Sequence, residues 1–345
     1  SINLYSKRIF FPKLIYFFSF DDNQIKSSPY NSIPSFEAVL PKFLVIRDKG
    51  SMHLSMNIKS QNKKKIIGLI EEFWSLRERI LSKDQFNIYK SDEINQDFFL
   101  EMLNQSRISL SKKVITGIKL INDDVLKKIV LGNRLILKVN KNLNLVNILK
   151  KLRLNHPNSC RYVWKRNSKD ITFGASPEKL FSFNKNLLIL EAVAGTAPSS
   201  LDKKILLKSQ KDLLEHNFVR DYLFQSLHHL NINEYKIEKM KVIKFGDVSH
   251  LYTEINSEIE TICPFLLLEY LHPSPAVCGV PKKEALFWIN NIEVYDRGNY
   301  ASPIGWIDSR GNSDFRVAIR GARFINNQIE ITAGSGIVKG SIAEN

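Results

Sequence analysis

Eight short apolar segments, each bounded by turn residues, constrain the fold of this 345-residue chain most strongly. Four follow one another between residues 161 and 193, and four more lie between residues 304 and 333. Segments this short, at hairpin spacing, predict β-strands. Helical patterns also occur, over residues 66–81, 142–154, 201–230 and 282–290. Because these patterns do not alternate as in βαβ units, the sequence predicts an α+β fold with sheets packed face to face.

The two parts of the chain differ in content, and no linker rich in Gly, Ser or Pro separates them. Residues 1–114 hold a buried-strand pattern at Ile9–Phe20 but no chemical constellation, so we expect an N-terminal scaffold within the same compact unit. Residues 115–345 hold the catalytic region. There, Asn122–Asp124 is expected to cap a helix through Val130, with Lys128 near the helix start.

Composition restricts the function classes. Ile9–Phe20 carries Lys13 and is too short to span a membrane, and no cleavage site for a signal peptide follows it. The three cysteines, which are odd in number and widely spaced, predict neither a zinc site nor disulfides, and they fit a reducing cytoplasm. The net charge of +15 comes from scattered lysines, so we expect neither nucleic-acid nor membrane binding.

Five motifs in a fixed order narrow the function further. They are Lys128–Leu131 (Lys-Ile-Val-Leu), Gly174–Glu178 (Gly-Ala-Ser-Pro-Glu), Glu191–Thr196 (Glu-Ala-Val-Ala-Gly-Thr), Leu271–Pro281 (Leu-His-Pro-Ser-Pro-Ala-Val-Cys-Gly-Val-Pro) and Ala333–Val338 (Ala-Gly-Ser-Gly-Ile-Val). Together they resemble the chorismate-utilising enzymes, and most closely isochorismate synthase. The resemblance covers about residues 115–345. It implies a two-layer sheet sandwich with outer helices, like anthranilate synthase component I, with chorismate as substrate and Mg²⁺ as cofactor.

The resemblance assigns both catalytic residues. Lys128 matches the lysine that activates water, and a lysine acts as a base only where burial or a nearby cation lowers its pKa. Glu178 matches the general acid, which must stay protonated near pH 7 to donate to a departing hydroxyl. After Leu131 the family has a small residue and then Arg. Here Asn133 takes that place, and the arginine follows one position later as Arg134.

The Glu191–Thr196 motif separates the reactions of the family. In aminodeoxychorismate synthases a lysine before Gly-Thr is the covalent nucleophile, whereas this chain has Ala194. Anthranilate synthases have Pro-Ile-Ala-Gly-Thr and lack the lysine that Lys128 matches. Water is therefore the expected nucleophile. Gly195 is expected to let backbone amides approach a carboxylate closely.

Further residues are assigned to substrate binding by the same resemblance. Tyr300 and Arg320 are expected to hold the pyruvyl carboxylate, because a planar guanidinium binds a carboxylate through two hydrogen bonds. The other expected substrate contacts are Ala194, Gly195, Thr196, His250, Ser274, Gly334, Ser335, Gly336 and Lys339.

Glu215, in Lys-Asp-x-x-Glu-His, is the expected magnesium ligand. Magnesium needs few protein carboxylates because substrate and water oxygens complete its shell. The second ligand of the family, a glutamate, is expected beyond Asn345, since Glu344 matches the position before it. We therefore expect the chain to be truncated at its C-terminal end.

Other functions stay open. Salicylate synthase keeps the same lysine and adds pyruvate elimination, although its motifs differ around Leu271–Pro281. An inactive homologue or a basic binding module is the alternative from another class. No residue separates a menaquinone pathway from a siderophore pathway, and the oligomeric state is not readable from the sequence.

Overall fold

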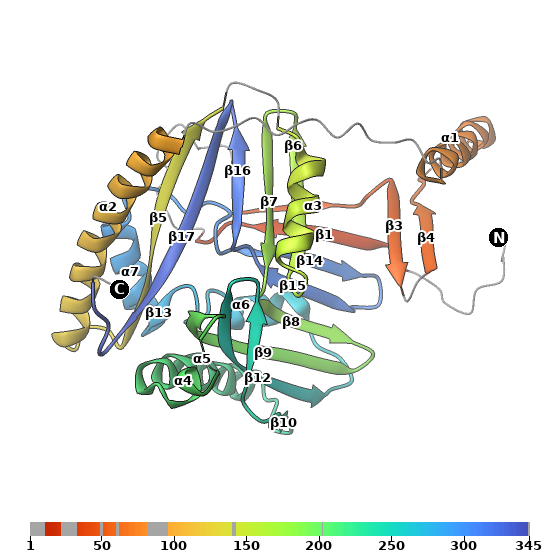
Figure 1. The fold of residues 1–345 in the computed structure, drawn as a ribbon. Helices are drawn as coiled ribbons and strands as arrows, with labels where there is room; N and C mark the ends of the chain where they lie inside the picture. The colour runs from red at the N-terminus through yellow and green to blue at the C-terminus, as the bar shows by residue number, and fades with distance from the viewer. Residues whose placement is uncertain are drawn as a thin grey trace.

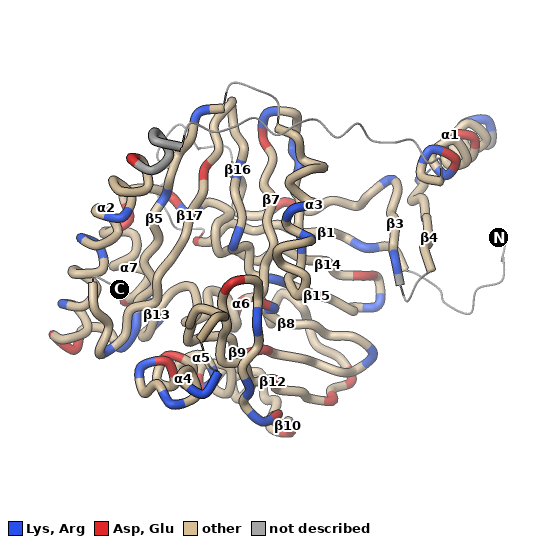
Figure 2. Tube along the Cα trace, viewed as in Figure 1, with Lys and Arg blue, Asp and Glu red and all other residues tan. Residues whose placement is uncertain are grey.

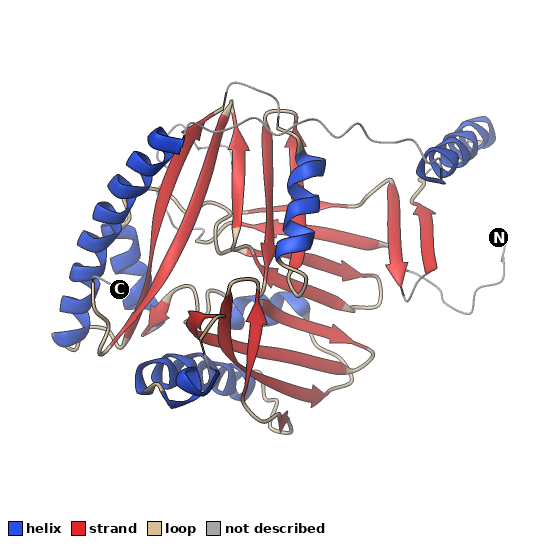
Figure 3. Ribbon diagram, in the orientation of Figure 1, coloured by secondary structure: helices blue, strands red, loops and turns tan. Residues whose placement is uncertain are grey.

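The computed structural model describes residues 11–21, 33–48, 51–59, 62–81, 96–139, 143–201 and 203–343. Two large antiparallel sheets form the centre, and most helices lie at the periphery (Figures 1 and 3). This arrangement confirms the predicted α+β sheet sandwich with outer helices.

The first sheet has nine strands. In spatial order they are β10 (Lys236–Ile237), β12 (Val248–Glu258), β9 (Leu187–Pro198), β8 (Lys179–Asn184), β15 (Ser313–Val317), β14 (Pro303–Asp308), β1 (Lys13–Phe18) and β2 (Phe36–Val39), with β11 (Lys241–Phe245) also paired to β12. The second sheet has six strands. They are β13 (Gly279–Val280), β5 (Lys128–Lys138), β17 (Gln328–Val338), β16 (Gly321–Ile325), β7 (Asp170–Ser176) and β6 (Cys160–Asn167).

Helices cover the outer surfaces of the sheets. On the six-stranded sheet, α2 (Gln96–Asn122) packs on β5 and α3 (Leu145–Asn155) on β6 and β7. On the nine-stranded sheet, α4 (Lys203–Lys208) and α5 (Gln210–His229) pack on β9 and β12. The remaining helices are α1 (Lys63–Leu81), α6 (Pro264–Leu271) and α7 (Lys282–Ile292). The hairpin of β3 (Phe43–Asp48) and β4 (Ser51–Met56) and helix α1 extend to one side of the sheets (Figure 1).

Aromatic side chains join the two sheets. Phe17 of β1 has no exposed surface, and its ring lies 5.7 Å from Trp164 and 6.4 Å from Tyr162 of β6. Ile304 and Ala318 complete this buried cluster. Burial of large rings supplies much of the free energy that holds such layers together.

The predicted helix around Lys128 was wrong. Lys128–Leu131 begins β5, and its first five residues are all buried. A short run that is apolar throughout fits a strand covered on both faces as well as it fits a helix, so its periodicity does not distinguish the two. The helix before it, α2, ends at Asn122 and was not predicted. The expected strand at Ile9–Phe20 is β1, although Ile9 lies outside the described residues.

Most other predicted elements are confirmed, but one predicted helix is two. The pattern over residues 201–230 contains α4 and α5, which meet at Ser209. The Ser209 hydroxyl caps α5 by accepting a hydrogen bond of 3.3 Å from the Asp212 amide.

The sequence also predicts that the charged residues are scattered and that the chain has no membrane span. Figure 2 shows Lys and Arg spread over many elements and interspersed with Asp and Glu. None of the helices in the described ranges is long and apolar enough to cross a membrane.

Candidate active site

The site forms at two of the connections through which the chain passes between the sheets. β7 ends in the six-stranded sheet at Ser176, and β8 begins in the nine-stranded sheet at Lys179, so Glu178 lies at the crossing. The chain returns between β15 and β16, where Arg320 precedes Gly321. Backbone hydrogen bonds join the crossings, from the Val317 amide to the Glu178 carbonyl (3.2 Å) and from the Ala175 amide to the Arg320 carbonyl (3.0 Å).

Lys128 projects from the first residue of β5 and has no exposed surface. Its Nζ donates a hydrogen bond of 3.0 Å to Glu215 Oε1 of α5. Gly336 of β17 makes room for this pair, because a Cβ at that position would collide with Glu215 Oε1 and lie 3.7 Å from Lys128 Cε. The structure thus brings together a buried amine, the expected metal ligand and a glycine of the last motif.

Glu178 is buried, with 8% of its surface exposed. Burial, with a smaller contribution from the charge of Glu191, raises its pKa to about 7 against the lowering influence of Lys128, Arg320 and a Ser274 hydrogen bond. A carboxyl group in this state is protonated in part near neutral pH. It can therefore donate a proton where an ordinary surface glutamate cannot.

A β-bulge shapes the Ala194–Gly195–Thr196 segment. Along the β9–β12 pair, His250 lies opposite Thr196 and Leu251 lies opposite Ala194, which leaves Gly195 as the extra residue. Gly195 has φ +75°, a conformation that glycine adopts without steric cost. Bulges redirect side chains, and this one lies beside the catalytic candidates.

The bulge starts a chain of hydrogen bonds across the site. Thr196 Oγ1 lies 2.9 Å from His250 Nδ1, and Arg320 donates to His250 Nε2 over 2.6 Å. Because an arginine only donates, Nε2 must accept, which places the imidazole proton on Nδ1. Burial and, to a smaller extent, the Arg320 charge lower the pKa of His250 to about 4, so the ring is neutral near pH 7. Arg320 itself has φ +52°, a strained conformation that occurs at functional sites.

The remaining expected substrate-binding residues differ in their surroundings. Gly334 approaches Tyr300 so closely that a Cβ there would lie 2.7 Å from the hydroxyl oxygen. Burial raises the pKa of Tyr300 to about 12, so its phenol remains a hydrogen-bond donor. Ser274 is 4% exposed and contacts Glu178. Ser335 pairs with Leu131, and Lys339 is exposed one residue after β17 ends.

The backbone amide of Thr196, next to Gly195, donates a hydrogen bond to another group of the protein. The Thr196 amide donates to Asp212 Oδ1 over 3.4 Å, and a Cβ on Gly195 would lie 3.0 Å from the Asp212 backbone oxygen. The close approach at Gly195 is therefore that of helix α5. It brings the start of the helix that carries Glu215 against β9.

Asn133 and Arg134 are the residues that depart from the family pattern after Leu131. They make structural contacts on opposite faces of β5. Asn133 anchors α2, because its amide nitrogen donates to the Ser106 carbonyl over 2.7 Å and its oxygen accepts from Lys113 (2.9 Å). Arg134 faces the opposite side, where it donates to the Asp296 carbonyl over 2.7 Å and lies over the Tyr295 ring.

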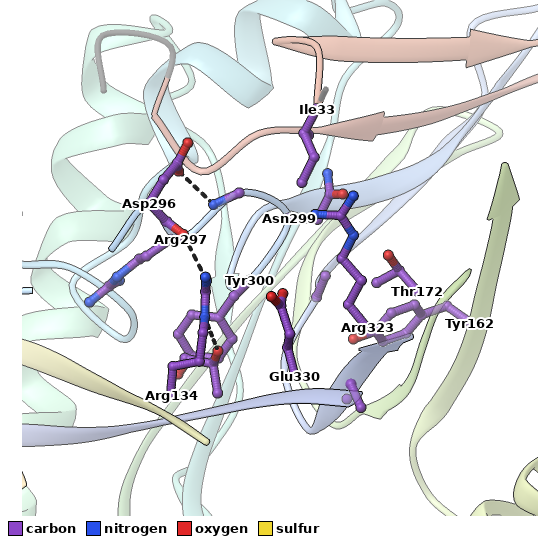
Figure 4. Close-up of a pocket in the computed structure, with 15 residues that line it drawn as sticks. Ile33, Arg134, Tyr162, Thr172, Asp296, Arg297, Asn299, Tyr300, Arg323 and Glu330 are labelled. Atoms are coloured by element: carbon purple, nitrogen blue, oxygen red, sulfur yellow. Dashed lines mark hydrogen bonds between the residues drawn. The ribbon is translucent and has the colours of Figure 1, made fainter. Parts of the chain in front are cut away.

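Arg134 lines a cavity of about 50 Å³ between the sheets (Figure 4). Glu330, Thr172 and Tyr300 also line it. The Glu330 carboxylate and the Thr172 hydroxyl are groups of the kind to which ordered water binds. Tyr300 thus lines this cavity and also lies against Gly334 of β17.

Two buried charged residues were not among the residues assigned to the site. Arg297 and Glu293 have almost no exposed surface and pair with each other over 2.5 Å. The sequence places Arg297 in a segment that resembles the family but gives no sign that its guanidinium contacts protein groups alone. Only the fold reveals those partners.

Glu215 suits a hard cation. Burial alone would raise its pKa, but the charge of Lys128 and its hydrogen bond outweigh burial and hold the pKa below its ordinary value. The carboxylate is therefore ionised, and one of its oxygens lies in the space that Gly336 leaves open. Among the described residues no three His, Cys, Asp or Glu side chains cluster as a complete metal site. Glu344, beside which a second ligand was expected, lies outside them.

Comparisons with known proteins give a family match and similar relatives. A family model described as "Chorismate binding enzyme" matches residues 2–345. Isochorismate synthase MenF of Haemophilus influenzae is 28% identical over 312 residues, which are 88% of this chain and 70% of the relative. MenF of Bacillus subtilis is 32% identical over 268 residues, 75% of this chain and 54% of the relative.

A solved structure extends the similarity to the fold. The putative 2,3-dihydroxybenzoate-specific isochorismate synthase DhbC from Bacillus anthracis superposes with a TM-score of 0.71 at 25% identity. The superposition covers 97% of this chain and 79% of that one. The chain thus spans between about half and four fifths of the length of these three proteins.

Proposed function

This chain belongs to the chorismate-binding enzyme family, and we propose that it converts chorismate to isochorismate. One observation carries the proposal. Lys128 has no exposed surface, and the buried Glu178 has a pKa of about 7. The two side chains lie close enough to interact electrostatically, near a connection that passes from one sheet to the other. An amine and a protonated carboxyl group are a base and an acid for moving a hydroxyl group around a ring.

In the proposed reaction, Lys128 in its neutral form takes a proton from a water molecule that attacks C2 of the chorismate ring. Glu178 protonates the hydroxyl that leaves C4, and the ring double bonds shift between these carbons. The product has the composition of the substrate, because one water molecule is added and one is lost. Lys128 projects from β5 and Glu178 from the connection between β7 and β8, which suits attack and departure at two different carbons of the ring.

The other residues bind and orient the substrate. Arg320 and Tyr300 are proposed to hold the pyruvyl carboxylate, and neutral His250 fixes the Arg320 guanidinium. The backbone of the Gly334–Gly336 segment is proposed to face the ring carboxylate. Holding the ring between these groups lowers the entropic part of the barrier.

Magnesium is the proposed cofactor, with Glu215 as its protein ligand here. Glu215 would hold the ion through its carboxylate, and the ion would supply positive charge that neutralises the ring carboxylate of the substrate. The short contact between Lys128 and Glu215 suggests that base and metal ligand are coupled.

The test is to incubate the protein with chorismate, with Mg²⁺ or with EDTA, and to resolve the products by chromatography. The proposal predicts isochorismate in the magnesium sample only. Salicylate together with pyruvate would favour the salicylate synthase alternative. Salt-sensitive DNA binding without chorismate turnover would favour a basic binding module.

A further inference from the structure

Arg297 is the largest side chain of the described residues without appreciable exposure, at 2%. It forms a two-pronged ion pair with Glu293, from NH2 to Oε1 over 2.5 Å and from Nε to Oε2 over 2.8 Å. Figure 4 shows its side chain directed away from the cavity that Arg134 and Glu330 line. Its partners are protein groups, so it is not placed to bind a substrate.

The ion pair completes the edge of strand β5. One edge of β5 pairs with β17 along its full length, whereas β13 covers the other edge only at Lys128 and Ile129. Beyond β13, the Val130 carbonyl accepts from Arg297 NH2 (2.8 Å), and the Gly132 amide donates to Glu293 Oε1 (2.6 Å). A guanidinium that donates and a carboxylate that accepts thus take the place of a neighbouring strand's backbone.

The same guanidinium reaches two other parts of the site. Its NH1 donates to the Val277 carbonyl over 2.8 Å, in the Leu271–Pro281 segment that also holds Ser274. It lies 5.7 Å from the Tyr300 ring centre, and Tyr300 follows it by three residues. One planar group therefore contacts the strand of Lys128, the segment of Ser274 and the ring of Tyr300.

We propose that the Glu293–Arg297 pair is a positioning unit, which holds the strand of Lys128 in register with the Ser274 segment and Tyr300. This inference rests on the proposed function for the roles of those residues. A buried ion pair contributes little net stability over apolar side chains of similar size, but its directional hydrogen bonds fix geometry. The rigid guanidinium fork suits this role better than an ammonium group, which is a single point.

The chain offers a matched control in the same sheet. Arg323 of β16 forms a similar buried, two-pronged pair with Asp170 of β7, at 3.0 and 2.9 Å. Within the described residues, neither Arg323 nor Asp170 forms a hydrogen bond with Lys128, Glu178 or Glu215. Arg297→Met and Arg323→Met therefore each remove a buried guanidinium from a carboxylate, although Asp170 keeps a second pair with Arg166 at 3.5 Å, and only the first variant removes the contacts to β5.

The experiment compares the two variants by hydrogen exchange and by steady-state kinetics at a temperature where circular dichroism shows both folded. We expect faster amide exchange over residues 128–134 in Arg297→Met alone, and a kcat at least tenfold below that of Arg323→Met. If Arg297→Met does not fold, Glu293→Gln replaces it. Glutamine has the shape of glutamate and keeps an oxygen that can accept from the Gly132 amide, but it weakens the pair with Arg297. We therefore expect a smaller increase in amide exchange over residues 128–134 and a smaller fall in kcat.

Equal exchange over residues 128–134 and equal kcat in the two variants would overturn the positioning role. A wild-type protein that fails to turn over chorismate would contradict the proposed function instead. In that case the exchange comparison still decides whether the pair holds β5, because it needs no substrate.

Discussion

The proposed role of Lys128 depends on a single atom, the Nζ nitrogen of its side chain. Its amine is buried and contacts Glu215, while its methylene groups pack in the core. Lys128→Met keeps the packing volume and removes the base, so we expect kcat to fall by about 10²–10⁴-fold, the usual contribution of a general base. Chromatographic assay of isochorismate measures this. Lys42→Met, which removes an exposed pair with Glu72, is the control, and equal activity of the two variants would exclude Lys128 as the base.

Glu178 should set the alkaline limb of the pH profile. A general acid works in its protonated form, so with a pKa of about 7 we expect kcat to fall as pH rises above 7. The Ser274 hydrogen bond lowers this pKa, so Ser274→Ala should move the limb to higher pH. Profiles of kcat from pH 5.5 to 9 measure both effects. A limb that stays in place in Ser274→Ala would mean that Glu178 is not the group titrating.

At the scale of elements, the bulge at Gly195 should be needed for function beyond its cost to stability. Gly195 and Gly311 both have positive φ, +75° and +83°, but only at Gly195 would a Cβ meet neighbours, namely Asp212. Each Gly→Ala change should cost about 1–2 kcal/mol of unfolding free energy. Gly195→Ala should in addition raise KM, because His250 and Thr196 lose their alignment. Urea unfolding and kinetics of both variants measure this, and equal KM values would contradict it.

The strands could be predicted where turns separate them. Segments such as residues 171–173 and 187–193 are bounded by polar or Gly/Pro residues, and they became β7 and β9. The Lys128–Leu131 run could not be assigned this way, since its continuous apolar pattern fits a buried strand and a helix alike. Helix α2 was missed because its amphipathic pattern is weak, with Leu103 and Ile108 exposed on its outer face.

The site residues could be proposed from motifs, but their partners could not. Spacing along the chain does not reveal that Lys128 and Glu215 meet, because 87 residues separate them. The role of Gly195 as a bulge also depends on its pairing with β12. Nor does the sequence show that Arg297 serves the edge of β5, since an edge exists only once the sheet has formed.

At the scale of the whole molecule, the two crossings explain why the site lies between the sheets. Glu178 and Arg320 lie in connections that leave one sheet for the other, so both are bonded to both layers. Lys128 and the glycines of β17 come from the six-stranded sheet, and Thr196 and His250 from the nine-stranded one. Catalytic groups held by rigid layers keep their geometry better than groups on loops. The same burial links the site to the stability of the whole chain.

Buried site groups should give the protein an unusual dependence of unfolding free energy on pH. Burial lowers the pKa of His216 and His250 from 6.5 to about 4, and that of His272 to about 3. In the unfolded chain these histidines bind protons below pH 6.5, whereas in the folded protein they stay neutral down to lower pH. The free energy of unfolding should therefore fall on acidification below pH 6.5.

Glu178 has the opposite effect, because its pKa rises from 4.5 to about 7 on folding. Its contribution to the free energy of unfolding is lost as pH rises through that window. In Glu178→Gln, unfolding free energy should therefore climb more steeply between pH 4.5 and 7, by on the order of 3 kcal/mol relative to wild type. Urea unfolding at half-unit pH steps measures this, and parallel curves for the two proteins would show that Glu178 does not keep its proton in the fold.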